Sequence, residues 1–269
     1  MSSIVPDAHH LSPGGAVPDR ILITGASGGL GRALAMHYAG PGRRLILWGR
    51  DPDRLAATAR MCRAAGADAT IRSVDQADIP AALAHLADEQ AAGPIGLALL
   101  VAGLGNIRAA DDLVEDATQV ARTGLVNFVA TAALAAALAR TMATRGAGRI
   151  VLVGSAAAFH ALPFAPAYAG SKAGLARFAE ALRIEVRRHG VGVTLVSPGF
   201  IDTALDRTVP DKRPFVISAA QAAARIAAAV DRGSAHAIFP WPFVVLRWVD
   251  RLLPRPLRDR LLGSLTPPG

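Results

Sequence analysis

The chain of 269 residues is 52% hydrophobic and 19% charged, which favours one large folded domain over intrinsic disorder. A formal net charge of +8 indicates an anionic partner, either a phosphorylated cofactor or an acidic membrane surface, whereas scattered arginines without zinc-ligand spacing argue against nucleic acid. The one cysteine, Cys62, excludes an internal disulfide and fits a reducing compartment, so we expect a cytoplasmic protein.

Apolar strands and helices alternate along the chain after a leader at 1–19, which we expect to be flexible. Strands are expected at 21–24, 45–48, 97–101, 149–153, 191–196 and 236–239, with a further strand that ends at Val74-Asp75. Helices are expected from 29 to about 38 and at 52–65, 79–90, 115–140, 166–188 and 219–231, the last opened by Ser218 and Gln221 at capping-box spacing. This alternation predicts an α/β fold, a parallel sheet with helices on both faces, in one domain at 20–240.

A glycine-rich turn, TGASGGLG at 24–31, separates the first strand from the first helix. Its glycines allow a tight turn, the approach of a phosphate and close packing of helix on strand, and the helix N-terminus offers N–H donors to a pyrophosphate. Because 26 of the 269 residues are glycine, chance is the alternative for this pattern taken alone. The candidate cofactor-binding residues of the turn are Gly25, Ser27, Gly29, Leu30 and Gly31.

Tyr168 and Lys172 form an i, i+4 pair on the helix expected at 166–188, so their side chains lie on one face. A free phenol has a pKa of about 10, and a neighbouring ammonium lowers the pKa of a phenol toward the range where proton transfer is efficient. The chain has only two tyrosines and two lysines, which makes a chance match at this spacing rare. The alternative is an ordinary pair on the helix surface.

Two polar residues that precede this pair complete the candidate catalytic set. Ser155 follows the strand at 149–153, where a hydroxyl points into the crevice at the carboxyl end of a parallel sheet; its alternative role is to begin a loop. Asn127 lies in the long helix, as either a catalytic group or a structural amide that bonds the backbone. The candidate catalytic residues are Asn127, Ser155, Tyr168 and Lys172.

Taken in order over about 20–205, these motifs resemble the short-chain dehydrogenase/reductase family, in its compact single-domain subclass. The resemblance rests on TGxxxGxG, the YxxxK tyrosine with a serine thirteen residues before it, and PGFIDT at 198–203. It implies a Rossmann-type fold with a seventh strand that binds NAD or NADP and transfers a hydride between nicotinamide and a carbonyl carbon. The chain departs from the family's Asn-Asn-Ala-Gly after the fourth strand, where it has Leu100-Val101-Ala102-Gly103.

The resemblance also implies a role for each candidate residue. Tyr168 exchanges the proton and Ser155 stabilises the substrate oxygen. Lys172 assists the tyrosine and orients the ribose, while Asn127 holds a water that relays protons to the lysine. Further cofactor contacts are implied for Ala102, Gly103, Tyr168, Lys172, Pro198, Gly199 and Thr203.

The end of the second strand bears on the choice of coenzyme. A carboxylate there favours the ribose hydroxyls of NAD(H), whereas a basic residue favours the 2′-phosphate of NADP(H). Arg50 follows Gly49, with Asp51 one position later, so we expect NADP(H) rather than NAD(H). In the family Asp75 would contact the adenine; the alternative role of this residue is in a turn or a helix cap.

The segment at 241–269 is predicted to be an amphipathic extension. Tryptophans flanked by arginines suit peripheral contact with the inner face of a membrane, while the alternative is a lid or an oligomer contact packed on its own domain. On a helix, one face would collect Val244, Val245, Trp248, Val249, Leu252 and Leu253. An apolar pocket, or plain core packing, is expected from Phe159, Leu162, Phe164 and Phe200.

The leading interpretation is an NADP(H)-dependent oxidoreductase that interconverts a ketone or aldehyde and an alcohol on a lipophilic small molecule, without a metal, as a homodimer or homotetramer. A non-catalytic dinucleotide-binding scaffold or redox sensor is the alternative, and the set of four candidate catalytic residues argues against it. A sugar-nucleotide epimerase or dehydratase would need a larger C-terminal substrate domain than this chain offers.

Overall fold

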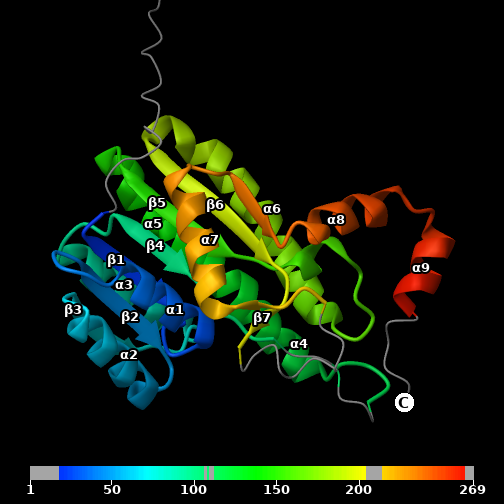
Figure 1. The fold of residues 1–269 in the computed structure, drawn as a ribbon, viewed down its shortest axis with the longest axis horizontal. Helices are drawn as coiled ribbons and strands as arrows, with labels where there is room; N and C mark the ends of the chain where they lie inside the picture. The colour runs from blue at the N-terminus through cyan, green and yellow to red at the C-terminus, as the bar shows by residue number, and fades with distance from the viewer. Residues whose placement is uncertain (1–17, 106–107, 109–111, 204–213, 264–269) are drawn as a thin grey trace, which may run out of the picture.

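A computed structural model of the protein describes residues 18–105, 108, 112–203 and 214–263. Seven strands form one sheet in the order β3-β2-β1-β4-β5-β6-β9, and every neighbouring pair is parallel (Figure 1). The predicted seven-stranded Rossmann-type sheet is therefore confirmed. The strands are β1 (Arg20–Thr24), β2 (Arg44–Gly49), β3 (Asp68–Ser73), β4 (Leu97–Leu100), β5 (Gly148–Val153), β6 (Val191–Pro198) and β9 (His236–Phe239).

The central strands are buried on both faces of the sheet. In β1, Ile21 and Ile23 belong to the core on one face and Leu22 to the core on the other, and all three are fully buried. Successive side chains of a strand point to opposite faces, so a strand that is covered on both sides is apolar at every position. This is why short apolar runs in the sequence located the strands.

Helices cover both faces of the sheet (Figure 1). One face carries α1 (Gly29–Tyr38), α2 (Pro52–Ala64) and α7 (Ala219–Asp231); the other carries α3 (Ile79–Ala91), α4 (Ala117–Gly124), α5 (Thr131–Arg145) and α6 (Pro166–Val186). Ser218 and Gln221 form the predicted capping box at the start of α7. Two short 3₁₀ turns, η2 (Ala156–Phe159) and η3 (Arg187–His189), follow β5 and α6.

The long helix predicted at 115–140 is a continuous helical run that contains a π segment. Between α4 and α5 lies the π-helix η1 (Leu125–Ala130), which the sequence did not predict. Among the described residues this run, Ala117–Arg145, is the one helix long and apolar enough to cross a membrane, but half of its most apolar window is buried inside the protein. That burial is what a core helix shows. π segments often occur at functional sites.

Four short elements follow the sixth strand, two of them before α7 and two after β9. Strands β7 (Ile201–Asp202) and β8 (Ile217–Ser218) form a two-stranded parallel sheet that was not predicted. The expected C-terminal amphipathic segment is divided at Pro254 into α8 (Pro242–Leu252) and α9 (Arg255–Gly263). Both helices extend away from the sheet, at the right of Figure 1. The expected domain boundaries, after 19 and after 240, stay predictions.

Candidate active site

The glycine-rich turn connects the carboxyl end of β1 to α1 at the edge of the sheet. Gly25 has a φ of 68°, a left-handed conformation that favours glycine. A side chain at Gly31 would collide with the carbonyl oxygen of Gly25, so helix and turn can pack together only with glycine there. A Cβ at Gly29 would lie 2.8 Å from Cγ2 of Thr203. Two segments predicted to bind the cofactor, the turn and PGFIDT, are therefore in contact.

The N-terminus of α1 fits the pyrophosphate of a dinucleotide. Its N-cap is Gly28, which has no side chain to accept from the first N–H groups of the helix. Those groups lack partners within the helix and carry its positive dipole end, which together attract an anion. Ser27 lies beside the end of β2, since a Cβ at Gly49 would be 2.6 Å from its Oγ. The Leu30 side chain is buried in the core, so only the backbone of this residue can contact a cofactor.

The end of β4 is held by the hydroxyl of Thr24, the first residue of the predicted motif. The Thr24 hydroxyl accepts the N–H groups of Val101, at 3.0 Å, and Ala102, at 3.2 Å. Gly25 approaches the same residue closely, because a Cβ there would lie 2.9 Å from the backbone of Ala102. The end of β4 therefore still approaches the glycine-rich turn closely, although this chain has Leu-Val-Ala-Gly where the family has Asn-Asn-Ala-Gly.

Asn127 is fully buried in the π segment, and its amide bonds the loop after β4. Its Oδ1 accepts from the backbone N–H of Leu104 at 2.7 Å, and its Nδ2 donates to the Leu104 carbonyl at 2.9 Å and to Ser171 Oγ at 3.2 Å. A Cβ at Gly103 would lie 3.1 Å from Asn127 Oδ1 and 3.4 Å from Lys172 Nζ. Asn127, Gly103 and Lys172 therefore converge, and Asn127 acts as a structural bond-maker whether or not it also relays protons.

Tyr168 and Lys172 are not a surface pair, because Lys172 is only 4% exposed. Its Nζ donates to the carbonyl of Val153 at 2.9 Å and lies 5.9 Å from the centroid of the Tyr168 ring. Burial lowers the pKa of the Lys172 ammonium to about 8, since a charged group is poorly solvated in the interior. The Lys172 ammonium therefore lies beside Tyr168 at the carboxyl end of β5.

Ser155 begins η2 directly after β5, as the sequence predicted for its position. Its Oγ accepts from the backbone N–H of Ala157 at 3.1 Å, which is the loop role foreseen as the alternative. The turn η2 packs against α6, the helix that carries Tyr168 and Lys172. A hydroxyl in such a bond still has its own hydrogen to donate, so both roles are compatible with the geometry.

Glu115 is a residue of this region that sequence reasoning missed. Its Oε2 accepts from the backbone N–H of Ala167 at 2.8 Å, immediately before Tyr168. The N-cap of α6, Ala165, provides no side-chain acceptor, and Pro166 opens the helix. A helix start without its own cap was the one available signal that an acceptor must come from elsewhere.

The predicted coenzyme-discriminating residues lie at the ends of β2 and β3. Arg50 is exposed and makes no ion pair or side-chain hydrogen bond within the described residues. Asp51 accepts from the N–H of Arg54 at 3.0 Å and caps α2, so its carboxylate is already engaged. Asp75 accepts from the N–H of Ala77 at 3.0 Å, which is the turn role named as its alternative.

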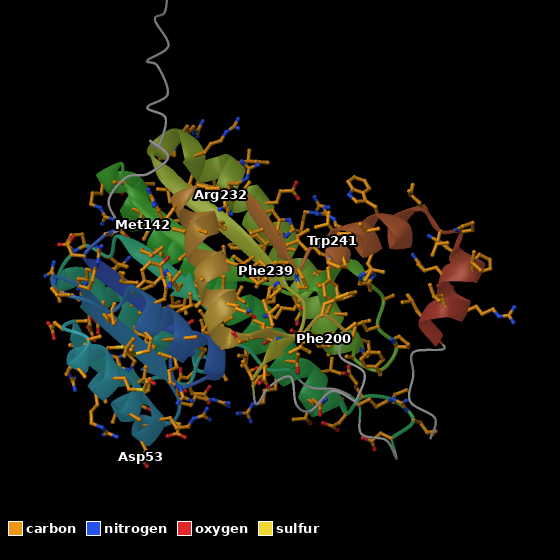
Figure 2. The ribbon with its side chains drawn as sticks, in the orientation of Figure 1. Asp53, Met142, Phe200, Arg232, Phe239 and Trp241 are labelled. Carbon is orange, nitrogen blue, oxygen red and sulfur yellow. The ribbon has the colours of Figure 1, made fainter. Side chains whose placement is uncertain are left out.

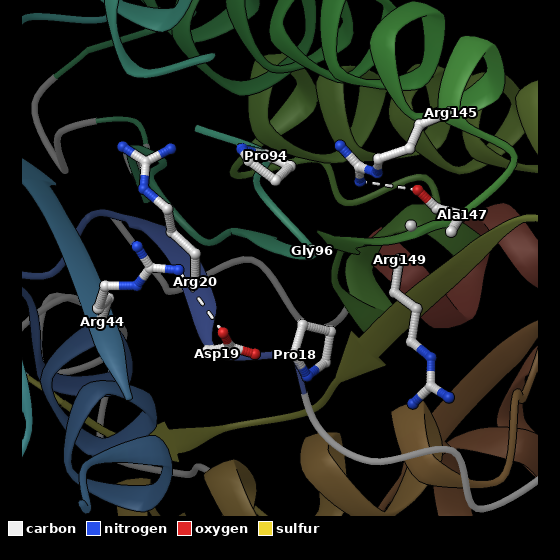
Figure 3. A pocket seen from close by; sticks show the side chains of 10 residues that line it. Pro18, Asp19, Arg20, Arg44, Pro94, Gly96, Arg145, Ala147 and Arg149 are labelled. Carbon is white, nitrogen blue, oxygen red and sulfur yellow. Dashed lines mark hydrogen bonds and ion pairs between the residues drawn. The ribbon is translucent and has the colours of Figure 1, made fainter. Parts of the chain in front are cut away.

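A hollow at the opposite edge of the sheet is separate from the candidate active site (Figure 3). It lies at the amino ends of the strands and is lined by four arginines, two of which bond neighbouring segments of the chain. Arg20 bonds the carboxylate and carbonyl of Glu89 and the carbonyl of Gly93, while Arg145 bonds the carbonyls of Ile95 and Ala147. Arg20 and Arg145 therefore stabilise the strand starts, and the lining of the hollow includes neither the glycine-rich turn nor the Tyr168–Lys172 pair.

We expect the burial of Lys172 to make stability depend on pH. The pKa falls from 10.5 to about 8 on folding, so the unfolded chain binds more protons between these values and the free energy of unfolding rises across this window, by about 3 kcal/mol. Urea denaturation at pH 8 and 10.5 measures the rise, and Lys172→Met should lack it. Other titrating groups, such as the buried Tyr38, are common to both proteins. An equal rise in the variant would contradict the assignment.

Comparison with known proteins agrees with this geometry. A family model described as short chain dehydrogenase matches residues 19–214. An uncharacterized oxidoreductase of Myxococcus xanthus (strain DK1622) is 34% identical over 241 residues, 88% of this chain and 94% of its own. A short-chain dehydrogenase from Sphingobium yanoikuyae, solved in complex with NADPH, has a TM-score of 0.76 at 26% identity and covers 94% of this chain and 98% of its own.

A short chain dehydrogenase from Mycobacterium paratuberculosis, solved bound to NAD, shares the fold with a TM-score of 0.72 at 24% identity, over 83% of this chain and 97% of its own. Both nicotinamide dinucleotides thus occur among structures with this fold. The chain belongs to the short-chain dehydrogenase/reductase family and is an NAD(P)-dependent oxidoreductase.

Proposed function

We propose that the protein is an NADP(H)-dependent oxidoreductase that interconverts a ketone or aldehyde and an alcohol on a lipophilic substrate. The observation that carries this proposal is the buried ammonium of Lys172, 5.9 Å from the ring centroid of Tyr168. A buried, desolvated lysine is unfavourable for stability, so its retention beside a tyrosine supports a chemical role. A scaffold that only binds a dinucleotide would need the glycine-rich turn but not this pair.

The bound nicotinamide dinucleotide supplies or accepts the hydride. Tyr168 gives its phenolic proton to the substrate oxygen in reduction and takes a proton from the alcohol in oxidation. Ser155 donates a hydrogen bond to the same oxygen and stabilises the negative charge that develops on it. Lys172 places a positive charge beside the tyrosine ring and has donors left for a ribose hydroxyl, since Val153 uses one of three.

Arg50 supports the preference for NADP(H). It is the first residue after β2, it is exposed, and no acid pairs with it among the described residues, so its guanidinium is available for a phosphate. The neighbouring carboxylate of Asp51 already caps α2 through one of its oxygens. The NADPH complex of the Sphingobium yanoikuyae relative is consistent with this preference, and the NAD complex of the other shows that the fold admits either coenzyme.

Aromatic side chains beside the cofactor segment support a lipophilic substrate. The rings of Phe200 and Phe215 each lie against Phe243, with centroid distances of 6.3 and 6.4 Å. Phe243 also fills the space beside Gly199, where a side chain would collide with its ring. Phe200 and Gly199 belong to the segment that contacts the glycine-rich turn through Thr203, so an apolar wall lies next to the proposed coenzyme site.

The reaction is tested by following NADPH absorbance with a panel of apolar ketones and aldehydes. We expect Tyr168→Phe to lower kcat about a hundredfold or more, because it removes the proton donor. Tyr38→Phe is the matched control: its buried hydroxyl has no hydrogen-bond partner in the described residues, and the variant should keep full activity. If no member of the panel is reduced, the non-catalytic interpretation gains; if Tyr168→Phe is fully active, the assigned role is wrong.

The coenzyme preference is tested by substitution at the end of β2. We expect Arg50→Ala to raise the dissociation constant of NADPH about tenfold and to leave that of NADH nearly unchanged, because only NADPH carries the 2′-phosphate. Coenzyme fluorescence titration measures both constants. Arg60→Ala, an exposed arginine further along α2, is the matched control and should change neither. Equal losses for the two coenzymes would contradict a phosphate contact.

Glu115 is expected to position Tyr168 through the start of α6. Glu115→Ala removes the acceptor for the N–H of Ala167 and should lower kcat about tenfold while leaving the dissociation constant of the coenzyme unchanged. Glu115→Gln keeps an acceptor oxygen and should restore most of the activity. Steady-state kinetics and coenzyme titration separate the two effects. Unchanged kcat in Glu115→Ala would show that the bond does not align the tyrosine.

A further inference from the structure

The two C-terminal helices present large apolar side chains that the described protein does not cover. We call residues 241–263, which comprise α8 and α9, the C-terminal arm. Trp241 is 74% exposed, Trp248 54% and Leu252 79%, and the second helix adds Leu257 and Leu261 at 55% and 53%. The arm extends away from the sheet, with Trp241 at its base (Figure 2). Such a concentration of exposed apolar residues marks an interaction surface.

The arm is attached to the domain along one side only. Phe243 is buried at 8% exposure among Phe200 and Phe215, and the Arg247 guanidinium lies 4.7 Å from the ring centroid of Phe159 in η2. These contacts fix the first turns of α8 beside the proposed substrate wall. Farther along α8 the apolar face is less covered: Val245 and Trp248, both expected on that face, are half exposed.

The net positive charge of the arm favours an anionic partner for this surface. Between 241 and 263 the sequence has five arginines and two aspartates, a net charge of +3. In α9, Arg255, Arg258 and Arg260 are accompanied by one acid, Asp259, which pairs with Arg258. Exposed tryptophans at 241 and 248, the second directly after Arg247, combined with this positive charge on short amphipathic helices, suit the interface of a membrane with anionic headgroups.

We propose that the C-terminal arm binds the surface of an anionic phospholipid bilayer. Trp241, Trp248 and Leu252 enter the boundary between headgroups and acyl chains, and the arginines of α9 pair with headgroup phosphates. A second copy of the chain is a poorer occupant, because two identical arms in contact would bring a charge of +3 against +3. The proposal does not rest on the enzymatic function, since vesicle binding needs neither coenzyme nor substrate.

Co-sedimentation of the full chain with unilamellar vesicles tests the proposal. We expect binding to vesicles of equimolar phosphatidylglycerol and phosphatidylcholine, weak binding to phosphatidylcholine alone, and loss of binding at high salt. Tryptophan emission should shift to the blue on binding, because Trp241 and Trp248 leave water whereas Trp48 is already buried. Trp241→Ala combined with Trp248→Ala should lower the partition coefficient at least about tenfold and remove the blue shift.

Two comparisons separate apolar insertion from charge and from general surface effects. Arg255→Gln with Arg258→Gln and Arg260→Gln should weaken binding to the anionic vesicles but not to phosphatidylcholine. Leu261→Ala should weaken binding, while Ile184→Ala, which changes a side chain of equal exposure (53%) on α6, should not. Thermal denaturation checks that each variant is folded.

Two outcomes would overturn the proposal. The first is that the wild-type protein does not bind the anionic vesicles, or that the tryptophan variant binds them equally well. The second is that sedimentation velocity shows an oligomer that the tryptophan variant dissociates, with no change in vesicle binding. That result would assign the arm to a contact between copies of the chain.

Discussion

The buried ammonium of Lys172 constrains most of the candidate site. A charge that is 4% exposed needs polar partners, and the carbonyl of Val153 provides one at the end of β5. The space beside the ammonium is narrow at position 103, where a Cβ would lie 3.4 Å from Lys172 Nζ and 3.1 Å from Asn127 Oδ1. Beside the same glycine, the amide of Asn127 bonds the loop after β4 and holds that loop in place. The Lys172 ammonium on α6 thus lies where four segments meet: α6 itself, the π segment and the ends of β4 and β5.

The sheet could be predicted from sequence because its signals are local. Every strand buried on both faces is an apolar run, and α7 begins at a capping box that four residues suffice to define. Contacts between distant segments left no such signal. The bond from Glu115 to Ala167 joins residues 52 positions apart, and the Thr24 hydroxyl reaches Val101 across 77. The π segment was also missed, because the residues around Asn127 are part of a long apolar helix whose sequence does not mark where the hydrogen-bond pattern changes.

The structure also separates what the candidate residues do for the fold from what they are proposed to do in chemistry. Ser155, Asp75 and Asn127 each have the structural hydrogen bonds that their alternative roles required. Ser155 and Asp75 keep capacity beyond these bonds, because a hydroxyl keeps its hydrogen and a carboxylate keeps a second oxygen, whereas both N–H donors of Asn127 are engaged. Arg50 differs, since within the described residues the fold makes no use of its guanidinium. No hydrogen bond or ion pair within the described residues constrains that side chain, so its identity could be read from the sequence but its role could not be read from the fold.

The position of β9 at the edge of the sheet has a consequence for biosynthesis. β9 pairs only with β6, and it is the last strand of the sheet along the chain. Until His236–Phe239 has been made, β6 is an open edge with apolar side chains on both faces, which is the kind of edge that pairs with other chains. A nascent or truncated polypeptide that stops before β9 would therefore be prone to aggregate even though six strands are already complete. The four residues of β9 cover the open edge of β6 and complete the sheet.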